Sequence, residues 1–442
     1  MNHAQAAPRL RAPVLVAVML VTACQTNTEP VATPEVIADI RAQATSLGDS
    51  GLLASAVRQR VLQSTSGATV VTLGEATHGT REFFLYKNQA IQILTESGTR
   101  IVAFEAPWAA TRAVNAYVQG EAVPEAVAMT ALQYNVWRTE EVRDLLRALR
   151  AANATRSPSA RVQFVGVDPQ DYGFTTGDGT MAQLDTLLRR TNLLLANQVK
   201  QYYAAAGAIA DTATRAGRFT SAQATRFTTL LREASTAVAA AAPQLAASLG
   251  ESDAAWAVRS AEVLRLFGDQ AVKSGAGDEA GAFTLRDSVM ADNLLWWTRR
   301  TGTTQRAVFW GHNGHTGVQD ADGVRTAGWF LRRTLGNALV SVGFSFGGGQ
   351  YNANVPNDPQ TAPPAPSSTV DGALASALTT PAWFDLRTVT GSLATWFTQA
   401  KGTRWLGAGG DSSPTRYLPY ALSPMFDALI FVPNVTASRK LP

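Results

Sequence analysis

Six side chains of the types that perform acid–base chemistry follow apolar runs of the chain. They are Glu75, His78, Glu105, Asp168, His312 and His315. The three histidines of this set lie in two glycine-bearing segments, GEATHG at 74–79 and GHNGH at 311–315, and the fourth histidine of the chain is His3. Glycine permits tight turns and close backbone approach. A histidine beside a carboxylate can accept a proton from water near neutral pH, while the carboxylate fixes its tautomer. This convergence predicts a shared site, although any one of these histidines alone would be read as a capping or core residue.

Two kinds of chemistry suit these residues. A second histidine can donate a proton to a leaving alcohol, and an arginine can stabilise the oxyanion of a tetrahedral intermediate. That combination fits ester hydrolysis by water, with no metal and no enzyme nucleophile. Histidine, aspartate and glutamate are also ligands of zinc and manganese, so the same residues could instead hold a metal ion. The sequence leaves both chemistries open.

A third possibility, a serine nucleophile, has little support. The segment GFSFG at 343–347 follows a predicted strand and matches the nucleophile-elbow pattern around Ser345. In that fold the acid and the histidine follow the serine, whereas no histidine follows His315 in this chain. We therefore interpret 343–347 as a glycine-rich strand end.

The polar side chains need strands that end next to one another. Apolar and β-branched runs predict strands at 69–73, 100–104, 162–167, 307–310, 339–342 and 429–432. Capping residues and apolar periodicity predict helices at 82–97, from Thr139 onward, at 287–299 and at 331–335, with a loop at 355–370. Residues 181–275 are rich in Ala, Leu and Thr without a strand pattern, which indicates several helices.

Strands that alternate with helices predict an α/β fold, with a mostly parallel sheet flanked by helices and a helical insertion or subdomain at 181–275. In open parallel sheets ligands bind outside the carboxyl ends of the strands. Because the six polar side chains follow four predicted strands, this arrangement would gather them at one edge of the sheet.

The composition excludes several classes of protein. The chain has 442 residues, 46% of them hydrophobic and 16% charged, which is typical of a globular protein. A single cysteine, Cys24, excludes an intramolecular disulfide and a cysteine-rich zinc site. No run of Lys and Arg interleaved with aromatic residues occurs, so nucleic-acid binding has no support.

The first residues have the features of an export signal. Arg9 and Arg11 precede a short apolar run at 14–21, and the string LVTAC ends at Cys24, as in a bacterial lipobox. We expect 1–23 to be a lipoprotein signal peptide, Cys24 to be acylated, and 24–40 to be a lipidated tether. The protein would then be exported and anchored by lipid to the membrane surface of the bacterial cell envelope. The alternative is an ordinary signal peptide with an incidental cysteine.

Several segments, in order along the chain, resemble the erythromycin esterase family. They are LGEATHGTREFF at 73–84, RIVAFEA at 100–106, WRTEE at 137–141, FVGVDPQD at 164–171, RDSVMADN at 286–293, WGHNGH at 310–315, GFSFG at 343–347 and DLR at 385–387. The resemblance runs from about residue 40 to residue 435, and the ordered combination is more specific than any single segment. It departs from the family pattern at Gly311, where the family has alanine, and in the lipobox and tether.

The resemblance implies an erythromycin-esterase-like α/β hydrolytic domain at 41–442, with the helical region beside a deep active-site cleft. It implies hydrolysis of a carboxylic ester or macrolide lactone by water, a reaction linked to antibiotic resistance and thought to need no cofactor. Carried over by position, His78 is the general base, Glu75 and Glu105 orient it, His312 or His315 aids proton transfer, and Arg286 stabilises charge. The substrate would be met by Arg81, Lys87, Trp137, Arg138 and Asp168.

Other interpretations remain open at this level. The cluster could belong to a metal-dependent hydrolase, or to a non-catalytic lipoprotein that binds a hydrophobic ligand such as haem through histidine. Glu105 and Arg286 could be a buried ion pair with only a structural role. The partners expected are a small ester or lactone and, through the lipid anchor, a membrane.

Overall fold

The computed structural model describes residues 32–48, 55–171, 179–321, 323–407, 413 and 415–442. Its central feature is a nine-stranded mixed sheet. The strand order is β1 (Thr45–Ser46), β10 (Ala382–Asp385), β13 (Ala428–Val435), β8 (Leu339–Tyr351), β2 (Val70–Leu73), β5 (Ala307–Trp310), β3 (Ile101–Pro107) and β4 (Gln163–Asp168), with β9 (Gln360–Ala362) paired to β8. The six strands from β13 to β4 are parallel, whereas β1, β10 and β9 pair antiparallel. The predicted α/β fold is confirmed, and the sheet is mixed because one end of it is antiparallel.

The registers of the central strands bring their carboxyl ends level. Leu73 at the end of β2 pairs with Trp310 at the end of β5, and Trp310 pairs on its other side with Phe104 of β3. The pairing of β3 with β4 shifts register between Phe104 and Pro107, so the backbone around Glu105 departs from the regular ladder. The segments that follow these strands therefore start from one edge.

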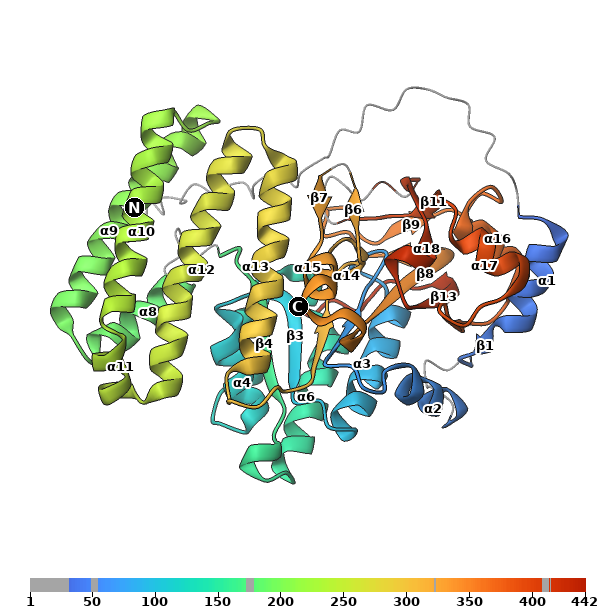
Figure 1. The fold of residues 1–442 in the computed structure, drawn as a ribbon, viewed down its shortest axis with the longest axis horizontal. Helices are drawn as coiled ribbons and strands as arrows, with labels where there is room; N and C mark the ends of the chain where they lie inside the picture. Colours follow the sequence, from blue (N-terminus) through green and yellow to red (C-terminus); the bar gives the residue numbers. More distant parts are fainter. Residues whose placement is uncertain (1–31, 49–54, 172–178, 322, 408–412, 414) are drawn as a thin grey trace, which may run out of the picture.

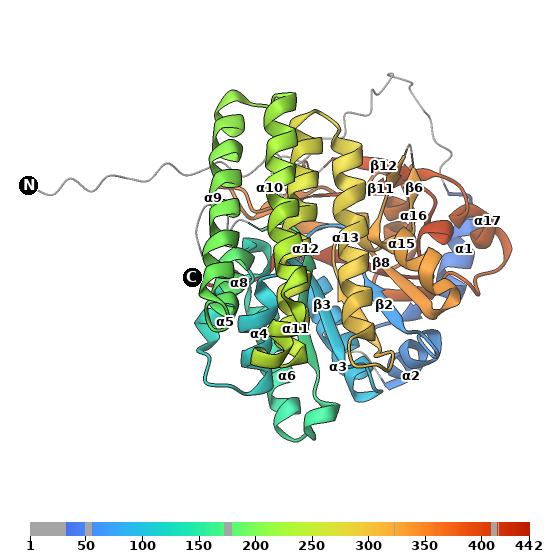
Figure 2. The same cartoon turned by 60° about the vertical axis from the view of Figure 1, so that its left-hand side comes forward.

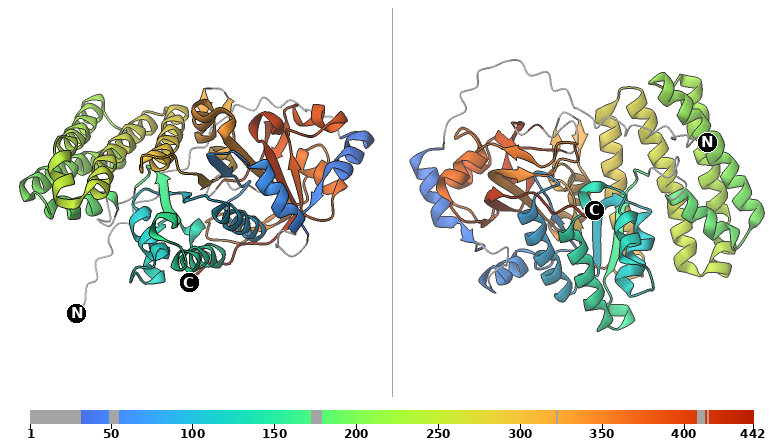
Figure 3. Two further views of the ribbon diagram at one scale, coloured as in Figure 1. Left: turned by 60° about the horizontal axis from the view of Figure 1, so that its bottom comes forward. Right: turned by 180° about the vertical axis from the view of Figure 1, so that it is seen from behind.

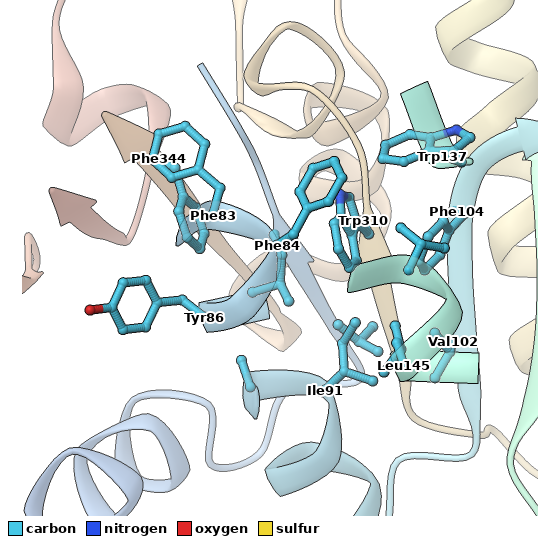
Figure 4. Packing of buried hydrophobic residues seen from close by; sticks show 14 of the residues in the cluster. Phe83, Phe84, Tyr86, Ile91, Val102, Phe104, Trp137, Leu145, Trp310 and Phe344 are labelled. Carbon is cyan, nitrogen blue, oxygen red and sulfur yellow. The ribbon is translucent and has the colours of Figure 1, made fainter. Parts of the chain in front are cut away.

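Alternate residues of the buried strands face two separate hydrophobic layers. Val71 and Val102 pack with α3 (Arg81–Glu96) and α6 (Glu140–Ala154) on one face. Val70 and Ile101 pack on the other face with α13 (Glu279–Arg299) and α15 (Ala327–Leu335). Burial of both faces is what a continuous apolar run in a parallel strand predicts. Figure 4 shows the first layer, in which aromatic rings from α3 meet those of β3, β5 and β8.

Residues 180–275 are helical, as the sequence predicts. The helices are α8 (Thr180–Arg189), α9 (Leu193–Ala216), α10 (Ser221–Ala240), α11 (Ala242–Leu249) and α12 (Glu251–Gly275). They stand together at one end of the molecule, and α13 lies between them and the sheet (Figures 1 and 2). Two further views show the same separation of the helical end from the sheet (Figure 3). Of the described helices, none has the length and apolar composition needed to cross a membrane.

Four predicted boundaries are wrong. Helix α13 begins at Glu279 rather than at 287, because Asp278 caps it by accepting a hydrogen bond from Gly281 N. Strand β8 continues through the glycine-rich segment 343–347 to Tyr351, because β13 pairs along it and β9 pairs at its end. The expected loop at 355–370 contains β9.

The fourth correction concerns the end of the expected tether. Residues 34–43 form helix α1 (Pro34–Gln43), whose N-cap Thr33 accepts a hydrogen bond from Val36 N. Val36 and Ile40 are buried against α16 (Val370–Ala377) and α17 (Gly391–Phe397). The folded part therefore begins before residue 41, and Cys24 with the rest of 1–31 lies outside the described residues.

Candidate active site

The carboxyl ends of four neighbouring parallel strands carry the predicted polar side chains. Glu75 and His78 follow β2, Glu105 lies near the end of β3, and Asp168 is the last residue of β4. The short helix α14 (Asn313–Thr316) follows β5 and is flanked by His312, which caps it. Hydrogen bonds and ring contacts join all six predicted polar side chains into one cluster.

His78 is paired with a buried carboxylate. Its Nδ1 lies 2.7 Å from Glu75 Oε1, and the fully buried Glu75 receives hydrogen bonds on Oε2 from Lys87 Nζ at 2.5 Å and Trp310 Nε1 at 3.0 Å. Two donors on Oε2 leave Oε1 to accept the Nδ1–H of the imidazole. The other ring nitrogen, Nε2, is then the basic atom of His78.

Lys87 lies behind this pair and has no exposed surface. Its ammonium group lies 4.8 Å from the ring centroid of Trp310 and 5.2 Å from that of Phe344. Burial lowers the pKa of Lys87 to about 8, against the opposing effect of the Glu75 charge. A side chain enclosed in this way holds Glu75 in place and does not reach a substrate.

Glu105 connects the two halves of the cluster. Its Oε1 lies 3.1 Å from Arg286 Nη2 and 3.1 Å from His315 Nε2, and its Oε2 accepts the backbone N–H of His312 at 2.9 Å. Burial would raise the pKa of this carboxyl, but the neighbouring charges of His315, His78 and Arg286 hold it well below its usual value. Glu105 is therefore a carboxylate that fixes the position of the 312–315 segment.

Arg286 is bound by two carboxylates on two strands. Its Nε donates to Asp168 Oδ1 at 3.1 Å and its Nη2 to Asp168 Oδ2 at 2.5 Å, while Nη2 also donates to Glu105. Tyr134 completes the shell of Asp168 by donating its hydroxyl to Oδ2 at 3.0 Å. Burial opposes the charge of Arg286, but Asp168 and Glu105 raise its pKa further above its ordinary value. One N–H of its Nη1 faces His315 Nε2 at 3.2 Å, which leaves the second N–H of Nη1 without a partner among the described residues.

His315 lies between two acidic groups. Its Nδ1 is 2.8 Å from Asp287 Oδ1, and its ring stacks on Phe283 with centroids 5.0 Å apart. Burial disfavours the imidazolium, but the charges of Asp287 and Glu105 outweigh it and raise the pKa of His315 to about 10. Asp287 is in turn fixed by the backbone N–H of Ala327 at 2.7 Å.

His312 has a different environment. Its Nδ1 accepts the backbone N–H of Gly314 at 3.0 Å, and its Nε2 lies 3.0 Å from the carbonyl oxygen of Leu406, to which it donates. Burial lowers the pKa of His312 to about 3, assisted by the positive charge that His78 can carry. Its ring centroid is 5.1 Å from that of His78, so His312 is a neutral neighbour of His78.

Trp137 packs against the ring of His78. It is fully buried, its ring is edge-on to His78 with centroids 5.5 Å apart, and its Nε1 donates to the Glu105 carbonyl at 2.8 Å. The rings of Phe104 and Trp310 pack against it (Figure 4).

Arg81 and Arg138 lie outside the histidine cluster. Arg81 Nε is 3.6 Å from Glu141 Oε1, and Arg138 Nη2 donates to the Pro442 carbonyl at 3.5 Å. Both arginines thus face the α6 side and the C-terminal segment 436–442, which runs along that side.

In the described part of the chain, the possible metal ligands of the cluster already have protein partners. No group of three or more His, Cys, Asp or Glu side chains there has a metal-binding arrangement. Both ring nitrogens of His312 are bonded to the backbone, and the Arg286 guanidinium fills the space between Glu105 and Asp168. The guanidinium of Arg286 therefore compensates the negative charge of these two carboxylates.

Ser345 has no place in the histidine cluster. It lies inside β8, and its hydroxyl donates to the buried Asp371 of α16. The strand continues beyond it, so the strand-to-helix turn of a nucleophile elbow is missing here.

Three residues of the cluster were not among the sequence-predicted site residues: Asp287, Tyr134 and Trp310. Asp287 follows Arg286 directly, so its place beside the predicted cluster could have been inferred had α13 been extended to its true start. Tyr134 lies in an irregular segment before a 3-10 helix (Asn135–Trp137), and no local pattern places its hydroxyl on Asp168.

Solved structures share this fold at low sequence identity. A protein from Bacillus cereus matches with a TM-score of 0.77 and 21% identity, covering 93% of this chain and 100% of its own. A succinoglycan biosynthesis protein matches with a TM-score of 0.74 and 20% identity, over 92% of this chain and 98% of its own. A histidine-to-asparagine mutant of the erythromycin esterase EreC, in its open conformation, has a TM-score of 0.65 and 16% identity, over 89% and 97%. These likenesses establish the fold.

The family model described as erythromycin esterase matches residues 94–435. This range includes Glu105, Asp168, Arg286 and both histidines of the 312–315 segment, while the GEATHG segment precedes it. Because the match covers more than half of the chain, the protein belongs to the erythromycin esterase family.

Proposed function

We propose that this protein is a hydrolase that cleaves a carboxylic ester or macrolide lactone with a water molecule activated by His78. The observation that carries the proposal is the pairing of His78 Nδ1 with Glu75 at 2.7 Å, which leaves Nε2 as a base at the edge of the cluster. His78 is 9% exposed, whereas Glu75 is fully buried. The histidine is thus the member of the pair that can meet water.

Arg286 supplies positive charge for the second requirement of ester hydrolysis. Attack of water on the ester carbon places negative charge on the carbonyl oxygen, and a fixed donor stabilises that oxyanion. The second N–H of Arg286 Nη1 is the available donor, and the other nitrogens are held by Asp168 and Glu105. Because these bonds already orient the guanidinium in the folded protein, it does not need to reorient during the reaction.

His315 is better suited than His312 to assist proton transfer. Asp287 and Glu105 raise the pKa of His315 to about 10, so it carries a proton at neutral pH, although burial opposes this. His312 is neutral, and backbone groups occupy both of its ring nitrogens. In this mechanism the Nε2 proton of His315, whose acceptor in the resting cluster is Glu105 Oε1 at 3.1 Å, passes to the leaving alkoxide, and His312, whose nitrogens are fixed by backbone groups, positions the neighbouring groups.

A substrate panel on matched variants tests the proposal. Purified protein is assayed against macrolides and simple carboxylic esters, with and without chelator. We expect turnover by the wild type to fall by about 10²–10⁴-fold in His78→Ala, because a positioned general base contributes that much. Arg215→Ala, which changes an exposed arginine of α9, is the matched control and keeps its activity.

Two results would contradict this mechanism. Activity that is unaffected by His78→Ala in a correctly folded protein would remove the general base. Activity lost on chelation, together with stoichiometric zinc or manganese in the purified protein, would favour a metal-dependent hydrolase instead. Absorbance after addition of haem separately tests the non-catalytic alternative.

We also propose that Cys24 carries the lipid anchor, on the strength of the lipobox-like LVTAC string alone. In cells fed radiolabelled fatty acid, the wild type incorporates label and Cys24→Ser does not. An unlabelled wild type, or equal labelling of both, would remove the anchor from the proposal.

A further inference from the structure

An open surface pocket of about 380 Å³, called the cavity below, lies along the C-terminal half of α13 beside Arg259 of α12, where the two helices run side by side (Figures 1 and 2). Its lining shares no residue with the histidine cluster and consists of Arg259, Asp292, Leu295, Trp296, Arg299 and Arg300. Residues 292, 295, 296 and 299 recur at helical spacing and so occupy one face of α13. The volume falls within the range of small-molecule sites, about 300–1,000 Å³.

The lining has an excess of positive charge, which Glu262 near Arg259 and Asp253 near Arg300 offset in part. Three arginines face one acid, Asp292. Arg259 donates from Nε to Asn293 Oδ1 at 2.9 Å, but its Nη2 is buried and has no hydrogen-bond partner in the described residues. A buried donor without an acceptor is costly, and an anion in the cavity would supply one.

Arg299 adds a second unused donor group. Its side chain takes part in no hydrogen bond or ion pair with the described residues and is exposed at the last turn of α13. Arg300, in contrast, is committed: its Nη2 donates to the Ser252 carbonyl at 2.9 Å, and its guanidinium lies 4.8 Å from the Trp297 ring centroid. The cavity therefore offers Arg259 and Arg299 for an anion.

The remaining lining is apolar and partly aromatic. Trp296 and Leu295 both contribute to the cavity wall. Trp296 is only partly buried, and the Arg300 guanidinium lies 5.1 Å from its ring centroid, so a ligand would contact the part of the ring that Arg300 leaves uncovered. A flat apolar group beside the anion would cover this surface, and an indole ring provides a large contact area for such a group.

We infer that this cavity is a binding site for a small aromatic carboxylate, separate from the histidine cluster. The carboxylate is bound by Arg259 and Arg299, whose guanidinium groups match its planar geometry. The ring of the ligand lies against Trp296 and Leu295. Asp292 at the rim opposes the anion and keeps its affinity modest.

Benzoate titrated into the purified protein, followed by calorimetry at low ionic strength, tests the inference. We expect saturable binding that Arg299→Ala weakens by about three- to tenfold, since one partly exposed charged contact is removed. Asp292→Asn should tighten binding, because it removes the like charge at the rim. Arg215→Ala, an exposed arginine of α9 far along the chain from the cavity, is the matched control and leaves affinity unchanged.

Opposite effects of the two lining variants could not arise from a general loss of structure. Absence of saturable benzoate binding, or equal affinity in Arg299→Ala and Arg215→Ala, would overturn the inference. If inorganic phosphate binds as tightly as benzoate, the inference that the ligand carries an aromatic ring is overturned. Loss of benzoate binding in His78→Ala would place the ligand at the histidine cluster and would also overturn it, whereas an inactive protein that still binds benzoate supports it.

Discussion

Glu75 contacts His78 through one oxygen and Lys87 and Trp310 through the other, and Lys87 supplies the positive charge beside this buried acid. The Lys87→Met variant removes the cation while filling a similar volume. We expect it to lower the free energy of unfolding by about 3–5 kcal/mol, because a buried charge is left uncompensated. Urea unfolding measures this change.

Two further variants separate charge from packing at this position. Adding Glu75→Gln to Lys87→Met should restore part of the stability, because no charge is then left unpaired, while activity stays low. Lys273→Met, at a half-exposed ion pair with Asp278, should change stability by less than about 1 kcal/mol. Equal losses of unfolding free energy in Lys87→Met and Lys273→Met would mean that the buried ion pair contributes no more to stability than the exposed one.

The protonation of His315 gives a second prediction for a single residue. Its pKa is raised to about 10 despite burial, by Asp287 and Glu105, from an ordinary value of 6.5. A raised pKa in the folded state stabilises the protein below pH 6.5, and this contribution is lost as the pH rises from 6.5 toward 10. In Asp287→Asn one acidic neighbour is gone, so the imidazole should lose its proton at a lower pH.

NMR of ring-labelled histidine measures this titration directly, and only four histidines need assignment. The wild-type His315 signal should remain that of an imidazolium above pH 8, and the Asp287→Asn signal should change below that pH. His312 serves as the internal reference, because burial keeps it neutral and lowers its pKa to about 3. An unshifted His315 titration in Asp287→Asn would contradict the assigned role of Asp287.

At the scale of elements, two glycines at the strand ends differ in what surrounds them. A Cβ on Gly74 would lie 2.1 Å from Asn313 Oδ1, whereas the nearest atom to a Cβ on Gly311 is Glu105 Oε2 at 3.2 Å. Asn313 joins α14 to β8 by donating to the Phe344 carbonyl at 2.8 Å. Gly74→Ala should therefore separate α14 from the sheet and cost about 1–3 kcal/mol.

Gly311→Ala is the matched comparison, and it introduces the residue found in the family pattern. It requires only a small shift of Glu105, so the fold should be retained with a loss below about 1 kcal/mol. Thermal unfolding of both variants measures which of the two is less stable. A Gly311→Ala variant as unstable as Gly74→Ala would mean that α14 has no room to adjust.

The elements also show which parts of the site were predictable. The strand runs around 70–73 and 307–310 are apolar and bounded by glycine, so the positions of Glu75, His78 and His312 followed from local pattern. The pairing of β8 with β13 and β9 depends on residues about 10 to 90 positions away, and so the extension of β8 was not predictable. The start of α13 was missed because Gly281 weakens the helical pattern. Lys87 was expected in the cleft because local spacing does not show which face of α3 is enclosed.

In the whole molecule, the cluster depends on segments that are far apart in the chain. Gly79, next to His78, accepts hydrogen bonds on its carbonyl from Asn352 N at 3.0 Å and Ser438 N at 2.9 Å. Arg439 N donates to Glu141 Oε2 at 3.1 Å, which joins the same C-terminal segment to α6. The segment 436–442 thus joins the loop that carries His78 to helix α6.

Deletion of residues 436–442 should consequently reduce activity more than stability alone explains. The loop around His78 would lose the Ser438 bond to Gly79, and a displacement of about 1 Å in a reacting group can lower kcat up to about 10²-fold. We expect a tenfold or greater loss of kcat at a temperature where circular dichroism shows the protein still folded. Deletion of 441–442 alone keeps the contacts of Ser438 and is the control, with kcat within about twofold of wild type. If both truncations lower kcat equally, or neither does, then Ser438 does not position the base and the segment only stabilises the fold.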